Sequence, residues 1–251
     1  LGVEPGRPVR AAVIGVGADL DVWPRHDVGE KGERCASADR VALRGIGAVA
    51  GSMNGGRINA AALGKRDTQS AHLRPQVADL LLEESLKPVR EAGHEVALFK
   101  LNYMNIKPCQ NCGGCEKTGV CILNDEMKEV YEAIRAADRF ILASPIFFFG
   151  LSAQAKAMID RCQSFWCDKY LLKKTIPAGP QGRKGLLIVV GGMKKEDGIH
   201  CAETTAKAFF RTISVPEHTT VSFLGVDAKG EILNQPTAMN DVYEAGKRLI
   251  G

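Results

Sequence analysis

The alternation of strand-like and helix-like segments after residue 56 constrains the fold of this chain most strongly. The clearest strand is Lys184-Gly-Leu-Leu-Ile-Val-Val190, an apolar run that ends at two glycines. The same signal predicts strands at 57–63, 95–101, 139–144, 184–190 and 219–224. Apolar residues at helical spacing predict helices at about 71–92, 127–134, 152–165, 201–213 and 238–250.

Five strands separated by helices predict a parallel sheet that is covered on both faces. Because crossovers between parallel strands are right-handed, the expected fold is a doubly wound α/β/α sandwich of three layers. Residues 1–56 do not join this pattern easily, although 9–14 could form a strand. We therefore expect an N-terminal extension of unknown role at 1–56 and a core domain at 57–251, with a cysteine-rich loop at 108–122.

Composition excludes several classes of protein. The net charge of +4 is too small to indicate nucleic-acid binding, and no apolar run approaches the length of a membrane span. The chain shows no signal-peptide pattern of a basic flank followed by an apolar core. Four of its eight cysteines crowd one loop, so a metal site in a reducing cytoplasm fits better than a disulfide framework.

The cysteine-rich loop carries the most specific chemical signal in the sequence. Its spacing is C-x2-C-x2-C-x5-C, formed by Cys109, Cys112, Cys115 and Cys121. Three thiols spaced two residues apart can converge on one inorganic centre, and the fourth can complete the shell, as in a cubane iron–sulfur cluster. Zinc is the competing metal because it also binds thiolates, although zinc ribbons normally use two separated C-x2-C pairs.

Three other segments are predicted at the carboxyl edge of the sheet, where open α/β sheets bind ligands. The loop 64–70 precedes a helix and offers donors and positive charge for a phosphate, although a capped turn explains it equally well. Segment 144–150 contains three consecutive phenylalanines, which could stack on a planar ligand or pack in the core. Gly191-Gly192 would let a flat ligand approach the backbone, or form an ordinary turn. Together they predict a mononucleotide with a flat ring, for which FMN is the natural candidate.

The order of these motifs resembles the NADPH-dependent FMN reductase family of flavodoxin-like proteins. The resemblance spans roughly residues 57–250 and rests on the cysteine loop with Asp125-Glu126-Met127, on Ser144-Pro145-Ile146-Phe147-Phe148, and on the stretch from Ser152 to Asp160-Arg161. The cysteine spacing resembles the iron–sulfur flavoprotein branch of that family. The chain departs from the family at the phosphate loop, where Gly64-Lys65-Arg66 replaces the usual Gly-Ser-Pro-Arg.

The resemblance implies the following site residues. The FMN phosphate would be held by Lys65, Arg66, Thr68, Gln69 and Ser70. The flavin ring would contact Ser144, Pro145, Ile146, Phe147, Phe148, Phe149 and Gly150, with Gly191 and Gly192 closing the other side. A [4Fe-4S] cluster would be ligated by Cys109, Cys112, Cys115 and Cys121.

The expected function is that of an iron–sulfur flavoprotein, an FMN-dependent oxidoreductase. It would pass electrons between the cluster, FMN and a small acceptor or a ferredoxin-like partner, with NAD(P)H or ferredoxin as donor. Relatives hold the flavin near a subunit boundary, so a homo-oligomer, either a dimer or a tetramer, is expected. One alternative is an NAD(P)H-dependent FMN or quinone reductase without a cluster, and another is a structural zinc loop on a non-enzymatic module. No acid or base is assigned, because His72 and His200 more often serve surface or capping roles.

Overall fold

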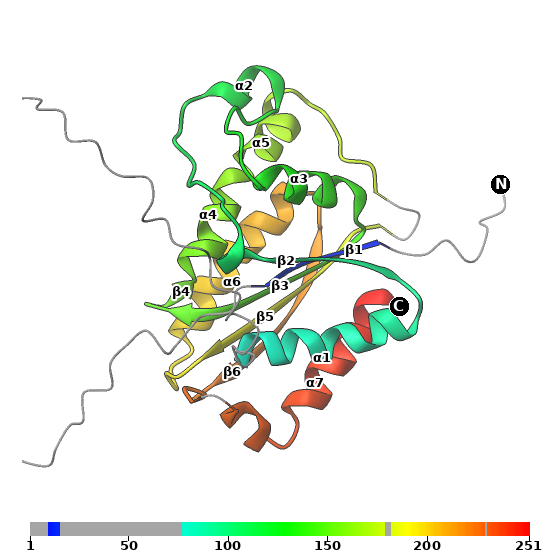
Figure 1. Cartoon of the computed structure of the whole chain (residues 1–251), viewed down its shortest axis with the longest axis vertical. Helices are drawn as coiled ribbons and strands as arrows, with labels where there is room; N and C mark the ends of the chain where they lie inside the picture. Colours follow the sequence, from blue (N-terminus) through cyan, green and yellow to red (C-terminus); the bar gives the residue numbers. More distant parts are fainter. Residues whose placement is uncertain (1–9, 16–76, 179–181, 229) are drawn as a thin grey trace, which may run out of the picture. The chain divides into compact units, whose positions relative to one another are not determined.

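Five parallel strands form the centre of the molecule in the computed structural model, which describes residues 10–15, 77–178, 182–228 and 230–251 (Figure 1). The strands are β1 (Arg10–Gly15), β2 (Glu95–Lys100), β3 (Arg139–Phe147), β5 (Lys184–Gly191) and β6 (Glu217–Leu224). Their order is β2-β1-β3-β5-β6, and the two-residue strand β4 (Gly150–Leu151) pairs antiparallel with the end of β3. This is the flavodoxin-like order, so the predicted fold class is confirmed.

The position of β1 corrects the sequence analysis. The expected first strand, 57–63, lies outside the described residues, and the strand between β2 and β3 is instead Arg10–Gly15. Part of the expected extension therefore belongs to the core sheet. The sequence indicates only a possible strand in this segment, because a single apolar run of this length carries no periodicity. The domain boundary at residue 57 lies outside the described residues and stays a prediction.

Helices cover both faces of the sheet. Helices α1 (Val77–Glu91) and α7 (Ala238–Ile250) pack on one face, while α3 (Met127–Ala136), α4 (Ala153–Arg161) and α6 (Asp197–Thr212) pack on the other (Figure 1). Successive residues of β1 enter opposite cores, since Ala11 and Val13 face α1 and α7 whereas Ala12 and Ile14 face the other layer. Burial on both faces explains why the central strands are almost continuously apolar.

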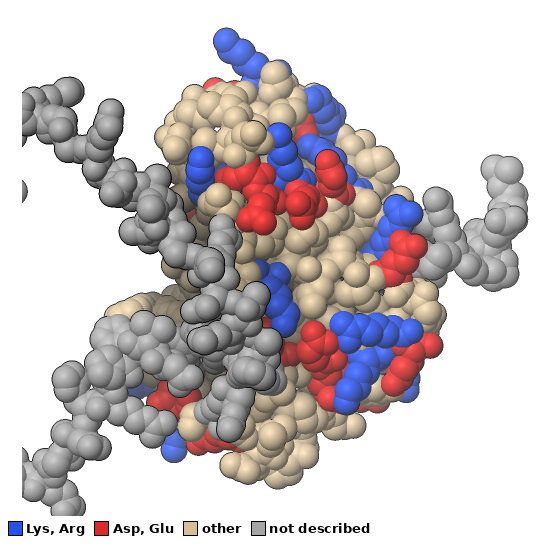
Figure 2. Space-filling model, viewed as in Figure 1, with Lys and Arg blue, Asp and Glu red and all other residues tan. Residues whose placement is uncertain are grey.

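The remaining elements are short and lie in the connections. The cysteine-rich loop contains α2 (Gly114–Thr118), and α4 is followed by α5 (Gln163–Trp166) and the π-helical turn η5 (Cys167–Leu171). Two 3-10 turns, η4 (Leu101–Tyr103) and η6 (Glu231–Asn234), complete the described elements. Acidic and basic side chains are interspersed on the face shown in Figure 2. Among the described helices, none combines the length and apolar character needed to cross a membrane.

A buried ion pair fastens both ends of the cysteine-rich loop to the core. The guanidinium of Arg161, the last residue of α4, donates to both carboxylate oxygens of Asp125, at 2.6 and 3.1 Å, and to the carbonyl oxygen of Lys107 at 2.8 Å. Asp125 also accepts the backbone N–H groups of Lys107 and Met127. The side chains of Arg161 and Asp125 are 0% and 1% exposed. Residues 107 and 125 therefore meet at one guanidinium, which closes the loop at its base.

The electrostatics of this pair are consistent with its geometry. Burial by itself raises the pKa of the Asp125 carboxyl, but the Arg161 guanidinium and the N–H of Lys107 outweigh burial and hold that pKa below its ordinary value. Hydrogen bonding to Asp125 likewise outweighs burial at Arg161 and raises the pKa of its guanidinium. Both partners therefore stay charged inside the protein at neutral pH.

Close packing between α1 and α7 gives the first prediction. A Cβ at Gly246 on α7 would lie 2.0 Å from the carbonyl oxygen of Ser85 on α1, and backbone cannot move aside cheaply. Gly246→Ala should therefore lower the free energy of unfolding by about 3 kcal/mol, although alanine favours an open helix by about 1 kcal/mol. Urea unfolding measures the change, and Lys247→Ala at an exposed position of the same helix is the control. Equal stability of Gly246→Ala and wild type would show that the helices do not approach so closely.

The buried ion pair gives the second prediction. Asp125→Asn leaves the Arg161 guanidinium buried without its counter-charge, so the free energy of unfolding should fall by about 3–5 kcal/mol at pH 7. Asp160→Asn is the matched control, because Asp160 pairs with Lys156 at the surface and its loss should change stability by less than about 1 kcal/mol.

The decrease in the free energy of unfolding caused by Asp125→Asn should also depend on pH. Since the pKa of Asp125 is lower in the folded state than its ordinary 3.8, its stabilisation is complete above that value and disappears as the pH falls through the folded-state pKa. The stability difference between wild type and Asp125→Asn should stay constant from about pH 8 to 5 and narrow only in stronger acid. A difference that shrinks toward pH 8 would rule out this origin.

Candidate functional site

Two glycines shape the cysteine-rich loop. Gly113 and Gly119 flank α2 with φ angles of 69° and 76°, in the left-handed region that favours glycine. The backbone N–H of Gly119 bonds to the carbonyl oxygen of Cys115, which ends the short helix. Gly119 has a second constraint, since a Cβ there would lie 1.7 Å from a carboxylate oxygen of Asp168. The glycines between the cysteines thus serve the turn geometry that brings the thiols together.

All four predicted cysteine ligands line one cavity. Cys109 and Cys112 are exposed, Cys115 and Cys121 are half-buried, and all four are free thiols. Other lining residues come from the same loop, from Arg161 at the end of α4 and from Gln163 at the start of α5. Within the described part of the chain, no three His, Cys, Asp or Glu side chains are arranged to hold a single metal ion. The thiols therefore surround a common space without forming a ready single-ion site.

Arg161 supplies a test of what would fit this cavity. Its side chain is buried and lines the cavity, and its Nε–H has no hydrogen-bond partner within the described residues. A buried donor without a partner is costly, so its presence beside four thiols favours an acceptor or an anionic group in the cavity. A centre bound by several thiolates would meet this requirement, because sulfur ligands are soft and carry negative charge. The four thiols and the buried arginine thus fit an iron–sulfur cluster.

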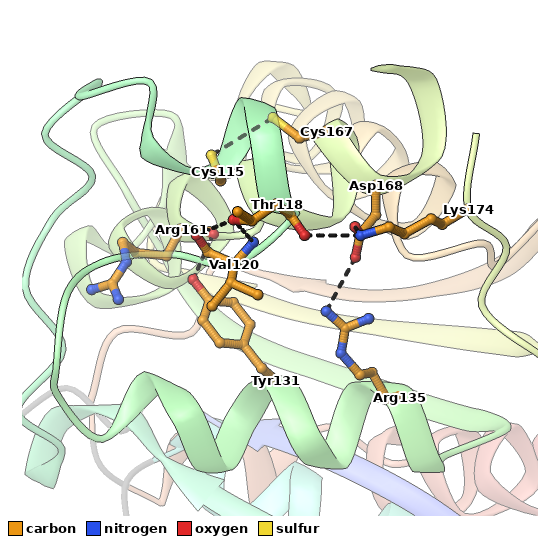
Figure 3. Close-up of polar contacts among 9 residues, drawn as sticks. All are labelled: Cys115, Thr118, Val120, Tyr131, Arg135, Arg161, Cys167, Asp168 and Lys174. Carbon is orange, nitrogen blue, oxygen red and sulfur yellow. Dashed lines mark hydrogen bonds and ion pairs between the residues drawn. The ribbon is translucent and has the colours of Figure 1, made fainter. Parts of the chain in front are cut away.

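The structure brings a fifth cysteine, Cys167, close to the four predicted ligands. Cys167, the first residue of η5, is fully buried, and its Sγ lies 3.6 Å from the Sγ of Cys115 (Figure 3). Burial, and then the neighbouring Cys167, raise the pKa of the Cys115 thiol to about 12. No signal in the sequence links these two residues, because they belong to separate elements that only the tertiary fold brings together.

Asp168 ties η5 to the cysteine-rich loop. Its buried carboxylate forms ion pairs with Arg135 of α3 at 3.2 Å and with Lys174 at 3.1 Å (Figure 3). The Lys174 ammonium also donates to the carbonyl oxygen of Thr118 at 2.8 Å. Together with the close approach of Asp168 to Gly119, these contacts fix η5 against α2. Sequence analysis missed Asp168 because its partners come from distant parts of the chain.

The predicted aromatic segment forms a strained hairpin. Phe147 pairs with Gly150 across β3 and β4, and the two residues of the turn, Phe148 and Phe149, have φ angles of 48° and 63°. Such turns normally use Asn-Gly, because bulky side chains are strained at positive φ. Phe148 is fully exposed, while Phe147 and Phe149 are half-exposed. Strained, exposed aromatic residues at the end of a central strand are typical of a ligand-binding surface.

Ser144 and the glycine pair differ from the other predicted flavin contacts. The Ser144 hydroxyl is buried and bonded to the N–H of Ser152 and the carbonyl oxygen of Pro145, so it serves the hairpin itself. A Cβ at Gly191 would lie 3.2 Å from Ile146, and one at Gly192 would lie 2.8 Å from Asp227. The space beside these glycines is therefore occupied largely by the protein's own side chains. Their contacts with a flavin stay predictions.

The carboxyl ends of the strands bring the remaining predicted segments to one edge. The aromatic hairpin lies at the end of β3 and the glycine pair at the end of β5, and these strands are neighbours, with Pro145 opposite Val190. The cysteine-rich loop leaves the same edge after β2. In this strand order a flavin binds where the order reverses, between β1 and β3. The predicted phosphate residues 65–70 lie outside the described residues.

Solved structures of known proteins share this fold. One is an NAD(P)H:quinone oxidoreductase from Methanothermobacter marburgensis, with a TM-score of 0.55, 14% identity and a match that covers 98% of each chain. Another is an FMN-dependent NADH-azoreductase from Bacillus anthracis in complex with FMN, with a TM-score of 0.51, 14% identity, and coverage of 96% of this chain and 100% of the other. At these identities the likeness establishes the fold alone.

Sequence comparison gives a more specific result. An iron-sulfur flavoprotein of Archaeoglobus fulgidus is 34% identical over 119 residues, which cover 47% of this chain and 57% of that protein. An iron-sulfur flavoprotein of Methanosarcina thermophila is 31% identical over 103 residues, covering 41% and 54%. The chain thus spans about half the length of these relatives. The family described as NADPH-dependent FMN reductase matches residues 70–223. The chain therefore belongs to the NADPH-dependent FMN reductase family, in the branch whose relatives are named iron-sulfur flavoproteins.

Proposed function

We propose that this protein is an FMN-dependent oxidoreductase in which Cys109, Cys112, Cys115 and Cys121 hold an iron–sulfur cluster. The family match supports the flavin, and the names of the curated relatives support the cluster. One structural observation carries the proposal: the four cysteines surround one cavity together with a buried arginine.

The residues around the cavity would perform three tasks. The four thiolates would bind the metal, and the loop's closure at Arg161 and Asp125 would hold them at a fixed separation. The positive charge of Arg161 would offset the negative charge that thiolates bring into a partly buried site. The unpartnered Nε–H of Arg161 would donate to whatever acceptor the cavity holds. Arg161 thus links the stability of the loop to the charge of its contents.

The aromatic hairpin would provide the flavin surface. Phe148 is exposed at the end of β3, where a planar ring could stack on it, and Ile146 and Phe147 precede it along the strand. FMN would supply two-electron chemistry that can also proceed one electron at a time, which suits a one-electron centre on the same domain. A related fold that contains FMN, the azoreductase from Bacillus anthracis, supports this cofactor.

The finer features of the function follow from the family resemblance. We propose NAD(P)H or a ferredoxin as electron donor, a small molecule or ferredoxin-like protein as acceptor, and a dimer or tetramer as the assembly. The phosphate contacts at residues 65–70 and a cytoplasmic location likewise stay predictions. The exposed phenylalanines of the hairpin are compatible with a site that a second subunit helps to cover.

Removal of a proposed ligand gives the third prediction. The full chain, purified without oxygen, should contain FMN and about four iron and four sulfide ions per chain. Cys112→Ser should lose most of the iron and the brown colour but keep FMN, because Cys112 lies in the cysteine cavity and not at the hairpin. Cys201→Ser is the matched control, since Cys201 is an exposed thiol on α6. Wild-type protein that carries FMN but neither iron nor sulfide would support the cluster-free reductase, and stoichiometric zinc would support a structural zinc loop.

The aromatic hairpin gives the fourth prediction. Phe148→Ala removes the exposed ring and should weaken FMN binding by roughly tenfold, which corresponds to about 1.4 kcal/mol of stacking. The quenching of FMN fluorescence during titration of the flavin-free protein measures the affinity. Tyr243→Ala is the control, because Tyr243 lies on α7 and contacts Glu91 of α1 rather than the hairpin. Unchanged affinity in Phe148→Ala would place the flavin elsewhere.

A further inference from the structure

We propose that Cys167 is a positioning residue that donates a hydrogen bond to Cys115 and thereby raises the reduction potential of the metal centre. This inference rests on the proposed function, because it concerns the state in which Cys115 binds iron. It goes beyond that function by giving a role to a cysteine outside the predicted ligand set. The residue would act on the metal through Cys115, without touching it.

The position of Cys167 supports an indirect role. Its Sγ lies 3.6 Å from the Sγ of Cys115, within the range of a sulfur hydrogen bond (Figure 3). Cys167 is fully buried and does not line the cavity that the four other thiols surround. It therefore lies behind Cys115 as seen from the cavity, where groups that orient and tune metal ligands are found.

The surrounding contacts hold this geometry in place. The next residue, Asp168, forms ion pairs with Arg135 and Lys174, and Lys174 in turn binds the carbonyl oxygen of Thr118 at the end of α2. Asp168 also lies so close to Gly119 that no side chain fits there. Because α2 carries Cys115 and η5 carries Cys167, these contacts fix the distance between the two sulfurs.

Chemistry decides the direction of the hydrogen bond. A cysteine that binds iron is a thiolate and has no proton to give, so only the S–H of Cys167 can donate. The Sγ of Cys167 also lies 4.0 Å from the amide nitrogen of Gln163, which can only donate to the sulfur. The proton of Cys167 is therefore directed toward Cys115.

The consequence is electrostatic. A hydrogen bond to a ligating sulfur withdraws electron density from the metal, and it stabilises the reduced state, which carries more negative charge, more than the oxidised state. Loss of the donor should lower the reduction potential without removing a ligand. A fifth ligand would behave differently, because its loss would remove iron.

The experiment compares four anaerobically purified full-length variants with wild type. Cys167→Ala removes the donor, and Cys167→Ser keeps one in the form of a hydroxyl. Cys162→Ala is the matched control, because Cys162 is also a fully buried thiol but contacts Met158 instead of the cysteine loop. Cys201→Ser controls for the loss of an exposed thiol. For each protein we measure iron and sulfide content and the circular dichroism spectrum. Spectroelectrochemical titration then gives the midpoint potential of the iron–sulfur cluster.

We expect Cys167→Ala to have a lower midpoint potential of the cluster than wild type. Cys167→Ser should restore this potential toward wild type, and both controls should leave it unchanged. A folded Cys167→Ala that loses its iron, even if Cys167→Ser retains it, would make Cys167 a ligand and overturn the inference, because a serine oxygen can also bind iron. An iron-loaded Cys167→Ala with the wild-type potential would overturn the inference and leave the proposed function intact. Loss of iron from both Cys167 variants would make Cys167 a ligand and overturn the inference, whereas wild type without iron would overturn the proposed function as well.

Discussion

The buried ion pair between Arg161 and Asp125 is the interaction on which the site depends. It joins the last residue of α4 to both ends of the cysteine-rich loop. A buried pair is stabilising only when its remaining hydrogen bonds are satisfied, and the carboxylate of Asp125 meets this condition with two backbone donors. Because the same guanidinium lines the cysteine cavity, the fold and the chemistry of the site share one residue.

Much of the architecture could be predicted because it depends on local patterns. The apolar pattern correctly predicts the positions of strands β3, β5 and β6 and helices α6 and α7. Burial on one or both faces of an element requires apolar residues at a regular spacing, which can be recognised in the sequence. Strand β1 could not be assigned firmly, because a short apolar run gains its meaning from its neighbours β2 and β3. The order of the strands is a tertiary property of this kind.

The candidate site also combines residues that local patterns predict with residues that only the tertiary structure reveals. The four cysteines were predictable because their spacing is a local property, and their convergence on one cavity follows from the turns at Gly113 and Gly119. Cys167 was not predictable, since its contact with Cys115 depends on how η5 packs against α2. Packing also shows what the spacing does not, namely that the buried hydroxyl of Ser144 bonds within the hairpin, while its contact with a flavin stays a prediction. The spacing of residues in the sequence thus predicts the candidate ligands, whereas the residues that pack against those ligands become known only from the tertiary structure.

The proposed function requires that one cavity brings four thiolates to an iron–sulfur centre. X-ray absorption at the iron edge of the anaerobically purified chain tests it most directly, because the technique reports the atoms bound to iron. We expect iron surrounded only by sulfur, with neighbouring iron atoms at the next distance, and loss of this signal in Cys112→Ser. Iron bound through nitrogen or oxygen, or a wild-type spectrum that persists in Cys112→Ser, would contradict it.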